Sequence, residues 1–324
     1  MVESSSHSNA GTEAGDWLYV SCGHSGYEAG KHDLSKGVCI RPTTAHETVR
    51  IHKVFERLIA QFPDALSLPA LSRHDSVSGG VWQLKRKPAD EPFLVIASEQ
   101  PLSQGDERIF EIASTPFLGS LVLSPEPGIQ FSYSHRRLPI LIEELRFVSC
   151  GLLRPVFRQG DASEYAAVYG DLRSSEPNQF ETLKNYVEQY VEACSIPLSS
   201  PFRLVALVSI AEGLLSKKPD PNDPTTSLRR QLSRKIVLVA NLDLSAPIIS
   251  DAFPNTRSDL ETVWKTLYDL RSEIAHGSTP NFQRDKFKLL VSLEAAQMFV
   301  NASVRMLLRM KLSRRQLMDD LQNI

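Results

Sequence analysis

The chain has 324 residues, 42% of them hydrophobic and 23% charged, which is the composition of a globular protein with room for about two domains. No apolar run approaches the roughly 18–20 residues of a membrane-spanning helix, and the N-terminus lacks the basic start and apolar core of a secretory signal. The four cysteines, at positions 22, 39, 150 and 194, form no disulfide framework. A reducing compartment fits best, and we expect a cytoplasmic protein without membrane contact.

Charge is divided unevenly along the chain. Residues 1–200 carry 18 Lys and Arg against 25 Asp and Glu, a net charge of −7, whereas residues 201–324 carry 18 against 13, a net charge of +5. A polyanionic partner such as RNA would be attracted to the second region and repelled by the first.

The first half of the chain predicts an α+β region. Residues 1–15 form a polar leader that we expect to be disordered, and residues 16–175 carry the α+β pattern. Apolar residues at helical spacing predict a helix over Thr48–Phe62. Short apolar runs separated by Gly, Pro, Ser and Asp, together with one strictly alternating segment, then predict a small antiparallel sheet. These segments are 92–96, 109–112, 118–123 and 129–134.

A helix is expected over Pro139–Phe147, and residues 151–170 show no clear pattern. From about Pro177 the pattern is helical throughout, which predicts an all-α bundle over residues 176–324. Its expected helices begin at Pro177, at the Ser200-Pro201 cap, near Leu228, at the Ser258-x-x-Glu261 capping box and at Arg284.

The most informative segment is Ser258–Pro280, SDLETVWKTLYDLRSEIAHGSTP. At about 100° per residue, Arg271 falls about 20° from Leu260, inside the apolar stripe of this helix. A guanidinium on a buried face is costly unless an anion meets it, so this position is a candidate functional site. His276 follows five residues later, at the helix end, with Gly277 as the expected C′ residue. Positions five apart differ by about 140°, so the two side chains converge only if the last turn unwinds, the arginine curls or two helices meet.

These residues resemble a known family. YDLRSEIAHG (268–277) is similar to the Arg-x4–6-His motif of HEPN domains, and in particular to the Tyr-Asp-x-Arg-Ser-x-x-x-His-Gly pattern of the Apea-like HEPN group. Upstream, FRLVALVSIAEGLL (202–215) and SLRRQLSRKIVLVANL (227–242) resemble the first two helices of that family. The resemblance covers about residues 176–324.

The resemblance implies a ribonuclease that cleaves RNA without metal or other cofactor, at a site shared by two protomers. His276 is then the general base or acid, for which an ordinary pKa near 6.5 is suitable, and Arg271 clamps the scissile phosphate. Many catalytic HEPN motifs place Asn, Asp or His directly after the arginine, where this chain has Ser272, which can still hydrogen-bond a phosphate or position the histidine. A role in a toxin or in antiviral defence is implied as well, with residues 16–175 as the region that meets an inhibitor or a sensor partner.

Structural readings of the same residues stay open. Arg271 could be neutralised by Asp269, Glu273 or Glu212, and His276 could serve as a helix cap. Glu212 could orient Arg271 or be solvated, and Tyr268 could pack at the edge of the stripe or donate an auxiliary hydrogen bond. One alternative function is a catalytically silent HEPN module that only dimerises or binds nucleic acid, and another is an unrelated helical regulatory domain.

Cations crowd the end of the last predicted helix, where they could contact RNA or simply satisfy the helix dipole. They are Arg305, Arg309, Lys311, Arg314 and Arg315. Two further patterns are set aside. Gly26–Lys31 has one residue too few for a phosphate-binding loop, and the set Cys22, His24, His32 and Cys39 fits no usual zinc spacing.

Overall fold

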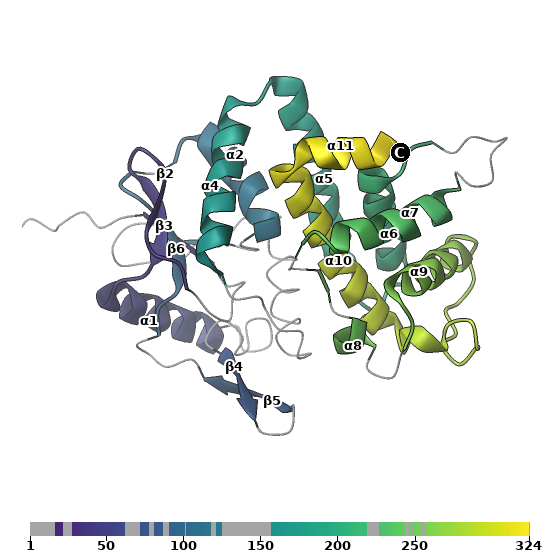
Figure 1. Ribbon diagram of the computed structural model, residues 1–324. Helices are drawn as coiled ribbons and strands as arrows, with labels where there is room; N and C mark the ends of the chain where they lie inside the picture. Colours follow the sequence, from purple (N-terminus) through teal and green to yellow (C-terminus); the bar gives the residue numbers. More distant parts are fainter. Residues whose placement is uncertain are drawn as a thin grey trace, which may run out of the picture.

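The computed structural model shows a small antiparallel sheet near the N-terminus followed by helices (Figure 1). The sequence predicts such a sheet, but from segments between 92 and 134, whereas three of its strands lie within residues 17–42. The structure describes residues 17–21, 28–61, 72–77, 81–86, 91–100, 102–117, 121–124, 157–218, 227–243, 246–247, 249–253 and 257–323. The predicted strand at 129–134 and the predicted helix at 139–147 lie outside these residues.

Strands far apart in the sequence form the sheet. Within the described residues its order is β2-β3-β6-β1-β7, with each neighbouring pair antiparallel. The strands are β1 (Trp17–Ser21), β2 (His32–Ser35), β3 (Val38–Pro42), β6 (Leu94–Ser98) and β7 (Leu121–Ser124). All five residues of β6 are buried, because it is the middle strand, so its sequence is a continuous apolar run. A separate hairpin pairs β4 (Ser72–Val77) with β5 (Val81–Arg86).

The expected strand at 109–112 is wrong, because these residues belong to helix α2 (Gln104–Phe117). Ser103 caps this helix, accepting a hydrogen bond from the Asp106 amide at 3.1 Å. The buried residues Phe110, Ala113 and Phe117 recur every three or four positions, which is the spacing of a helix face. A four-residue apolar run in sequence did not distinguish the two structures.

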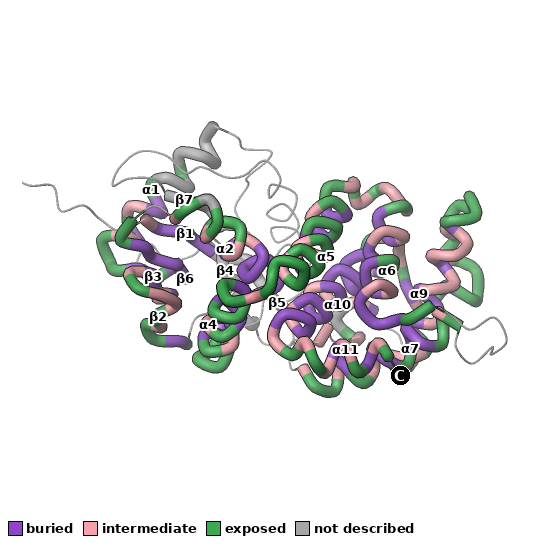
Figure 2. Tube along the Cα trace, turned by 90° about the horizontal axis from the view of Figure 1, so that it is seen from above, coloured by how far each residue is buried: buried purple, intermediate pink, exposed green. Residues whose placement is uncertain are grey.

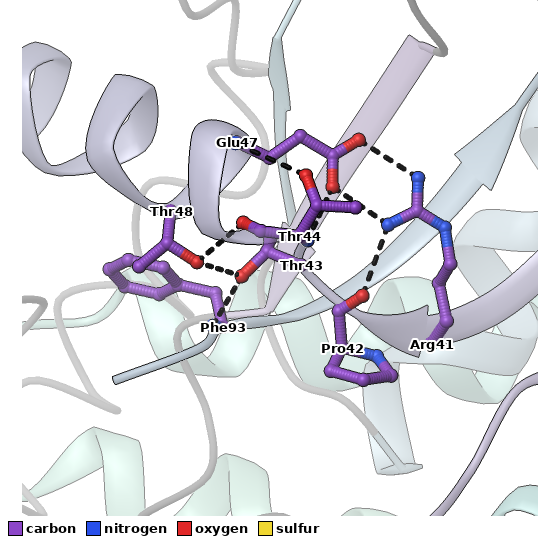
Figure 3. A network of polar contacts seen from close by, with 7 residues as sticks. All are labelled: Arg41, Pro42, Thr43, Thr44, Glu47, Thr48 and Phe93. Atoms are coloured by element: carbon purple, nitrogen blue, oxygen red, sulfur yellow. Dashed lines mark hydrogen bonds and ion pairs between the residues drawn. The ribbon is translucent and has the colours of Figure 1, made fainter. Parts of the chain in front are cut away.

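The predicted helix at 48–62 is confirmed as α1 (Ala45–Gln61), and Figure 3 shows how it begins. Thr44 and Glu47 form a capping box: the Glu47 amide donates to the Thr44 hydroxyl, and the Thr44 amide donates to the Glu47 carboxylate at 2.7 Å. Arg41, at the end of β3, binds the same carboxylate with two nitrogens at 2.8 and 2.9 Å. Burial would raise the pKa of Glu47, but the hydrogen bonds from Arg41 and Thr44 outweigh it and lower that pKa. This contact fixes α1 to the sheet.

The described residues from Pro177 onward are helical, as expected, and the segment whose pattern was unclear in the sequence also contains a helix, α4. The helices of this half of the chain are α4 (Gln159–Ser174), α5 (Pro177–Ser195), α6 (Phe202–Leu215), α7 (Leu228–Ala240), α8 (Ile249–Ala252), α9 (Leu260–Ala275), α10 (Leu293–Ser313) and α11 (Arg315–Asn323). The last long helix begins later than predicted. Residues 288–290 form a short 3-10 helix, and α10 starts after the Ser292 cap, whose hydroxyl accepts from the Ala295 amide at 3.1 Å.

Helix α10 joins the two regions. It packs on α5, α6 and α8 within the bundle and on α2 and α4 beside the sheet, so one continuous buried cluster extends through the described residues of both regions. Figure 2 shows these buried segments running from the strands to α6 and α10. None of the described helices has the length and apolar character needed to cross a membrane.

Candidate functional site

Helix α9 carries the motif, and its burial pattern fixes which way the motif faces. Asp259 caps the helix, accepting from the Thr262 amide at 2.7 Å, so the predicted cap at Ser258 is one residue too early. The buried face packs on α6 and α7. It consists of Val263, Trp264, Thr266, Leu267, Leu270 and Ile274.

Arg271 lies at the edge of this face and not in its middle. Leu260 is only partly buried, whereas Leu270 is fully buried. The centre of the buried face therefore lies toward Leu270, and not near Leu260 and Arg271 as the sequence predicted. The Arg271 side chain is 25% exposed and reaches across to α6. Its Nη2 donates to Glu212 at 3.2 Å and to the Ser209 hydroxyl at 3.4 Å, and its guanidinium lies 5.8 Å from the centre of the Tyr268 ring.

Glu212 is the carboxylate that neutralises Arg271. Its side chain is 12% exposed. Burial raises the pKa of Glu212, while the charge of Arg271 and a hydrogen bond from Tyr268 lower it, and burial has the larger effect. Burial also raises the pKa of Tyr268, with the Glu212 charge adding to the rise. Of the alternatives left open for Glu212, pairing with Arg271 is therefore the one that the structure adopts.

The cluster Ser209–Glu212–Tyr268–Arg271 is incompletely satisfied. Glu212 Oε1 and Arg271 Nε are buried and make no hydrogen bond within the described part of the chain. Arg271 Nη1 also makes no hydrogen bond among the described residues. It belongs to a side chain that is one-quarter exposed. Unsatisfied buried polar atoms are rare in folded proteins, and they are one mark of a functional site.

His276 is displayed at the end of α9 by a complete C-terminal cap. The Gly277 amide donates to the Ile274 carbonyl at 2.9 Å and the Ser278 amide to the Glu273 carbonyl at 2.9 Å, which is the Schellman pattern. Gly277 has a φ of +83°, a conformation that favours glycine. His276 is the exposed C-cap residue, and among the described residues it makes no hydrogen bond to Arg271. The last turn of α9 therefore does not unwind to bring the two together.

The other two carboxylates considered for Arg271 have partners of their own. Asp269 holds Arg229 of α7 with two bonds, at 2.8 and 3.0 Å. Glu273 pairs with Arg284 at 2.8 Å and Lys286 at 3.3 Å. Ser272 is partly buried on α9 beside Arg271.

Sequence reasoning missed Ser209. It lies three residues before Glu212 on α6, and therefore on the same face of that helix. The spacing is visible in the sequence, but nothing in the sequence marks this serine as the one that meets α9.

The cations at the end of α10 separate into two kinds. Arg309 and Lys311 turn inward: Arg309 binds Asp161 and Glu164 of α4, and Lys311 pairs with Asp319. Arg315 donates to the Gln179 side chain at 2.6 Å, and Arg314 donates to the Leu242 carbonyl at 3.2 Å, both as exposed contacts. Arg309 and Lys311 are thus committed to ion pairs within the chain, whereas Arg314 and Arg315 make exposed hydrogen bonds.

No group of three or more His, Cys, Asp or Glu within the described residues is arranged to hold a metal ion. Of the four residues considered for zinc, His32 and Cys39 lie on the paired strands β2 and β3, while Cys22 and His24 lie outside the described residues.

Comparison of the chain with family models, curated proteins and solved structures gives no match. The roles of Arg271 and His276 therefore have to be argued from their own geometry and from the motif that contains them.

Proposed function

We propose that the chain is a metal-independent RNA endonuclease of HEPN type, with Arg271 and His276 as its catalytic residues. The observation that carries the proposal is the state of Arg271. One nitrogen of its guanidinium is anchored to Glu212, and the side chain stays one-quarter exposed, five residues before an exposed histidine on the same helix.

The anchored arginine is suited to bind a phosphate. Glu212 and Ser209 both hold Nη2 from the α6 side, which fixes the plane of the guanidinium without occupying Nη1. A fixed guanidinium can donate to phosphate oxygens and stabilise the negative charge that builds up on them in the transition state. A bound anion could accept hydrogen bonds from the Arg271 nitrogens that have no partner, although it could not satisfy Glu212 Oε1, which is itself an acceptor.

The proposed reaction needs one base and one acid. His276 of one copy removes the proton from the ribose 2′-hydroxyl, and the 2′-oxygen attacks the phosphorus. The bond from phosphorus to the 5′-oxygen breaks, and that oxygen takes a proton from the second histidine. The products are a 2′,3′-cyclic phosphate and a 5′-hydroxyl, with no metal or redox step.

A homodimer supplies the second histidine. Arg271 and His276 do not meet within one chain, and pairing of two antiparallel α9 helices about a two-fold axis would place two of each around one groove. In this proposal Tyr268 and Ser272 lie beside the groove, and Arg305, Arg314 and Arg315 guide the RNA backbone. A ribonuclease of this kind fits a cytoplasmic toxin or antiviral-defence protein, with residues 16–175 meeting an inhibitor or sensor.

A second candidate is a catalytically silent HEPN module for dimerisation or nucleic-acid binding. The Arg271–Glu212 ion pair favours it, because a structural arginine has a carboxylate partner of this kind. In that case the arginine stabilises the α6–α9 contact, and His276 is only a helix cap.

The decisive experiment is incubation of the full chain with labelled tRNA and mRNA in EDTA, followed by analysis of the product ends. We expect cleavage that survives chelation and gives 2′,3′-cyclic phosphate ends. Arg284→Ala is the matched control, because it removes an exposed arginine paired with Glu273 near the same helix. Activity that disappears in EDTA and returns with magnesium would refute the mechanism, and an absence of cleavage in every condition would favour the silent module.

A further inference from the structure

Two surfaces away from α9 have complementary chemistry. The first is a groove of about 500 Å³ between α2 and α5, the two helices on either side of the seam between the sheet region and the bundle. Its apolar residues are Ile112 of α2 and Val187 and Val191 of α5. Glu188 and Glu192 line the same groove from α5, are exposed, and have no ion-pair partner within the described residues.

Three carboxylates and two cations line the groove. Glu111 is a third carboxylate, and Arg108 and Lys184 are the two cations. Lys184 is already matched by Glu181, at 2.8 Å on the same helix. The charges that remain open to a partner on α5 are therefore the two glutamates, one helical turn apart and beside two valines that are also one turn apart.

The second surface is the outer stripe of α7, formed by Arg230, Arg234 and Leu238 at intervals of four residues, together with Leu242 in the turn that follows the end of α7 at Ala240. Leu238 is 52% exposed and Leu242 is 47% exposed. Arg230 and Arg234 are exposed and make no ion pair in the described part of the chain, unlike their neighbour Arg229. Two open cations followed by two exposed leucines form an unpartnered amphipathic stripe.

The α2–α5 groove and the α7 stripe cannot contact each other within one chain. Helices α5 and α7 each pack on α6, and α6 lies between them in both views (Figures 1 and 2). The lengths are comparable: at 1.5 Å per residue the α5 face from residue 184 to 195 spans about 16 Å, and the part of the stripe on α7, from 230 to 238, spans about 12 Å, with Leu242 beyond the helix end.

We propose that the outer stripe of α7 in one copy of the chain docks into the α2–α5 groove of a second copy. The leucines cover Ile112 and the two valines, and Arg230 and Arg234 meet Glu188 and Glu192. This is a helix-in-groove contact joining two different surfaces. Each copy then still has one free groove or one free stripe, so the contact extends into a chain of copies or closes into a ring. It is separate from the proposed pairing of α9 helices, which buries a different face.

The test is sedimentation velocity on the full chain over about 1–100 µM. Two charge-reversed proteins are compared with wild type, Glu188→Arg/Glu192→Arg in the groove and Arg230→Glu/Arg234→Glu in the stripe. Wild type should form larger species as its concentration rises, and 1 M salt should reduce them, because salt screens the charge pairs. Each reversed protein alone should lose these larger species.

An equimolar mixture of the two charge-reversed proteins distinguishes docking of the stripe into the groove from a general effect of the changed charge. The groove-reversed copy keeps a wild-type stripe and the stripe-reversed copy keeps a wild-type groove, and the two reversed surfaces carry opposite charges as well. An equimolar mixture should therefore recover the larger species that each protein alone has lost. Glu294→Arg/Asp320→Arg is the control, because it makes the same change of charge at exposed residues of α10 and α11.

The proposal is overturned if wild type sediments identically at all concentrations, if the control loses the larger species equally, or if the mixture equals the sum of its parts. Nuclease activity of the reversed proteins is measured separately, so failure here leaves the proposal for Arg271 and His276 unaffected.

Discussion

Two arginines of this chain, Arg309 and Arg271, bridge pairs of helices in contrasting ways. Arg309 on α10 meets two carboxylates, Asp161 at 2.6 Å and Glu164, and its guanidinium lies 4.9 Å from the centre of the Phe117 ring. Burial would lower the pKa of Arg309, but the hydrogen bonds and charges of the two acids outweigh it and raise that pKa. Arg271 on α9 meets one carboxylate, whose own pKa is raised by burial.

The two arginines differ in how completely the rest of the chain satisfies them. Arg309 is enclosed by groups that match its charge and its flat face, and it fixes α10 to α4. Arg271 keeps unsatisfied atoms on both partners of its ion pair and one-quarter of its surface exposed. The sequence offered both as contacts to RNA, and the structure shows that Arg309 is committed to ion pairs with α4.

The largest expected effect is on cleavage. Arg271→Ala and His276→Ala should each reduce the rate by about 100- to 10,000-fold, because one removes the phosphate clamp and the other the proton transfer. RNA affinity should fall more for Arg271→Ala, since the histidine acts mainly in the transition state. Single-turnover rates and filter binding measure both quantities. Unchanged cleavage rates in both variants would mean that Arg271, like Arg309, has only a structural role.

The next effect is on stability at the α4–α10 contact. Arg309→Ala should lower the free energy of unfolding by about 3–5 kcal/mol, because it strands Asp161 and Glu164 beside a half-buried seam. Chemical denaturation measures this loss. The triple change Arg309→Met, Asp161→Asn and Glu164→Gln should recover most of it, since no charge is then left unpaired. A loss below 1 kcal/mol in Arg309→Ala would show that this contact does not hold the two regions together.

A smaller loss is expected for Arg271→Ala, about 1–2 kcal/mol, because the ion pair is single and partly exposed. Adding Glu212→Gln should restore part of the loss by removing the stranded carboxylate. A double-mutant cycle on Arg271 and Glu212 measures their coupling directly. Additive losses would mean that Glu212 does not position the arginine.

The smallest effect concerns pH. The pKa of Glu212 is raised above its ordinary value of 4.5, so the folded chain binds this proton more tightly than the unfolded chain. Its contribution to stability is therefore fully present below pH 4.5 and is lost as the pH rises through the folded-state pKa. Relative to Glu212→Gln, wild type should lose stability over that interval, and the loss should be larger in an Arg271→Ala background. Denaturation at a series of pH values checks the sign.

The sequence by itself determined the local structure wherever the apolar spacing was long and regular. The helices α1, α5, α6, α7 and α9 follow from such spacing, and β6 follows from a short run of β-branched and apolar residues. Where the run was only four residues, at 109–112, spacing could not separate helix from strand, and the prediction was wrong. The cap of α9 was misplaced by one residue because Ser258 and Asp259 are both good caps.

Only the tertiary structure decided how the charged residues are used. The sequence placed Arg271 and His276 on one helix, but it could not show that Glu212 and Ser209 approach from α6, or that Asp269 is taken by Arg229. It also could not show that Arg309 faces α4, 145 residues away in the chain. Ion pairs between helices depend on how those helices pack, and packing is set by the shape of all the buried side chains together, which local spacing does not encode.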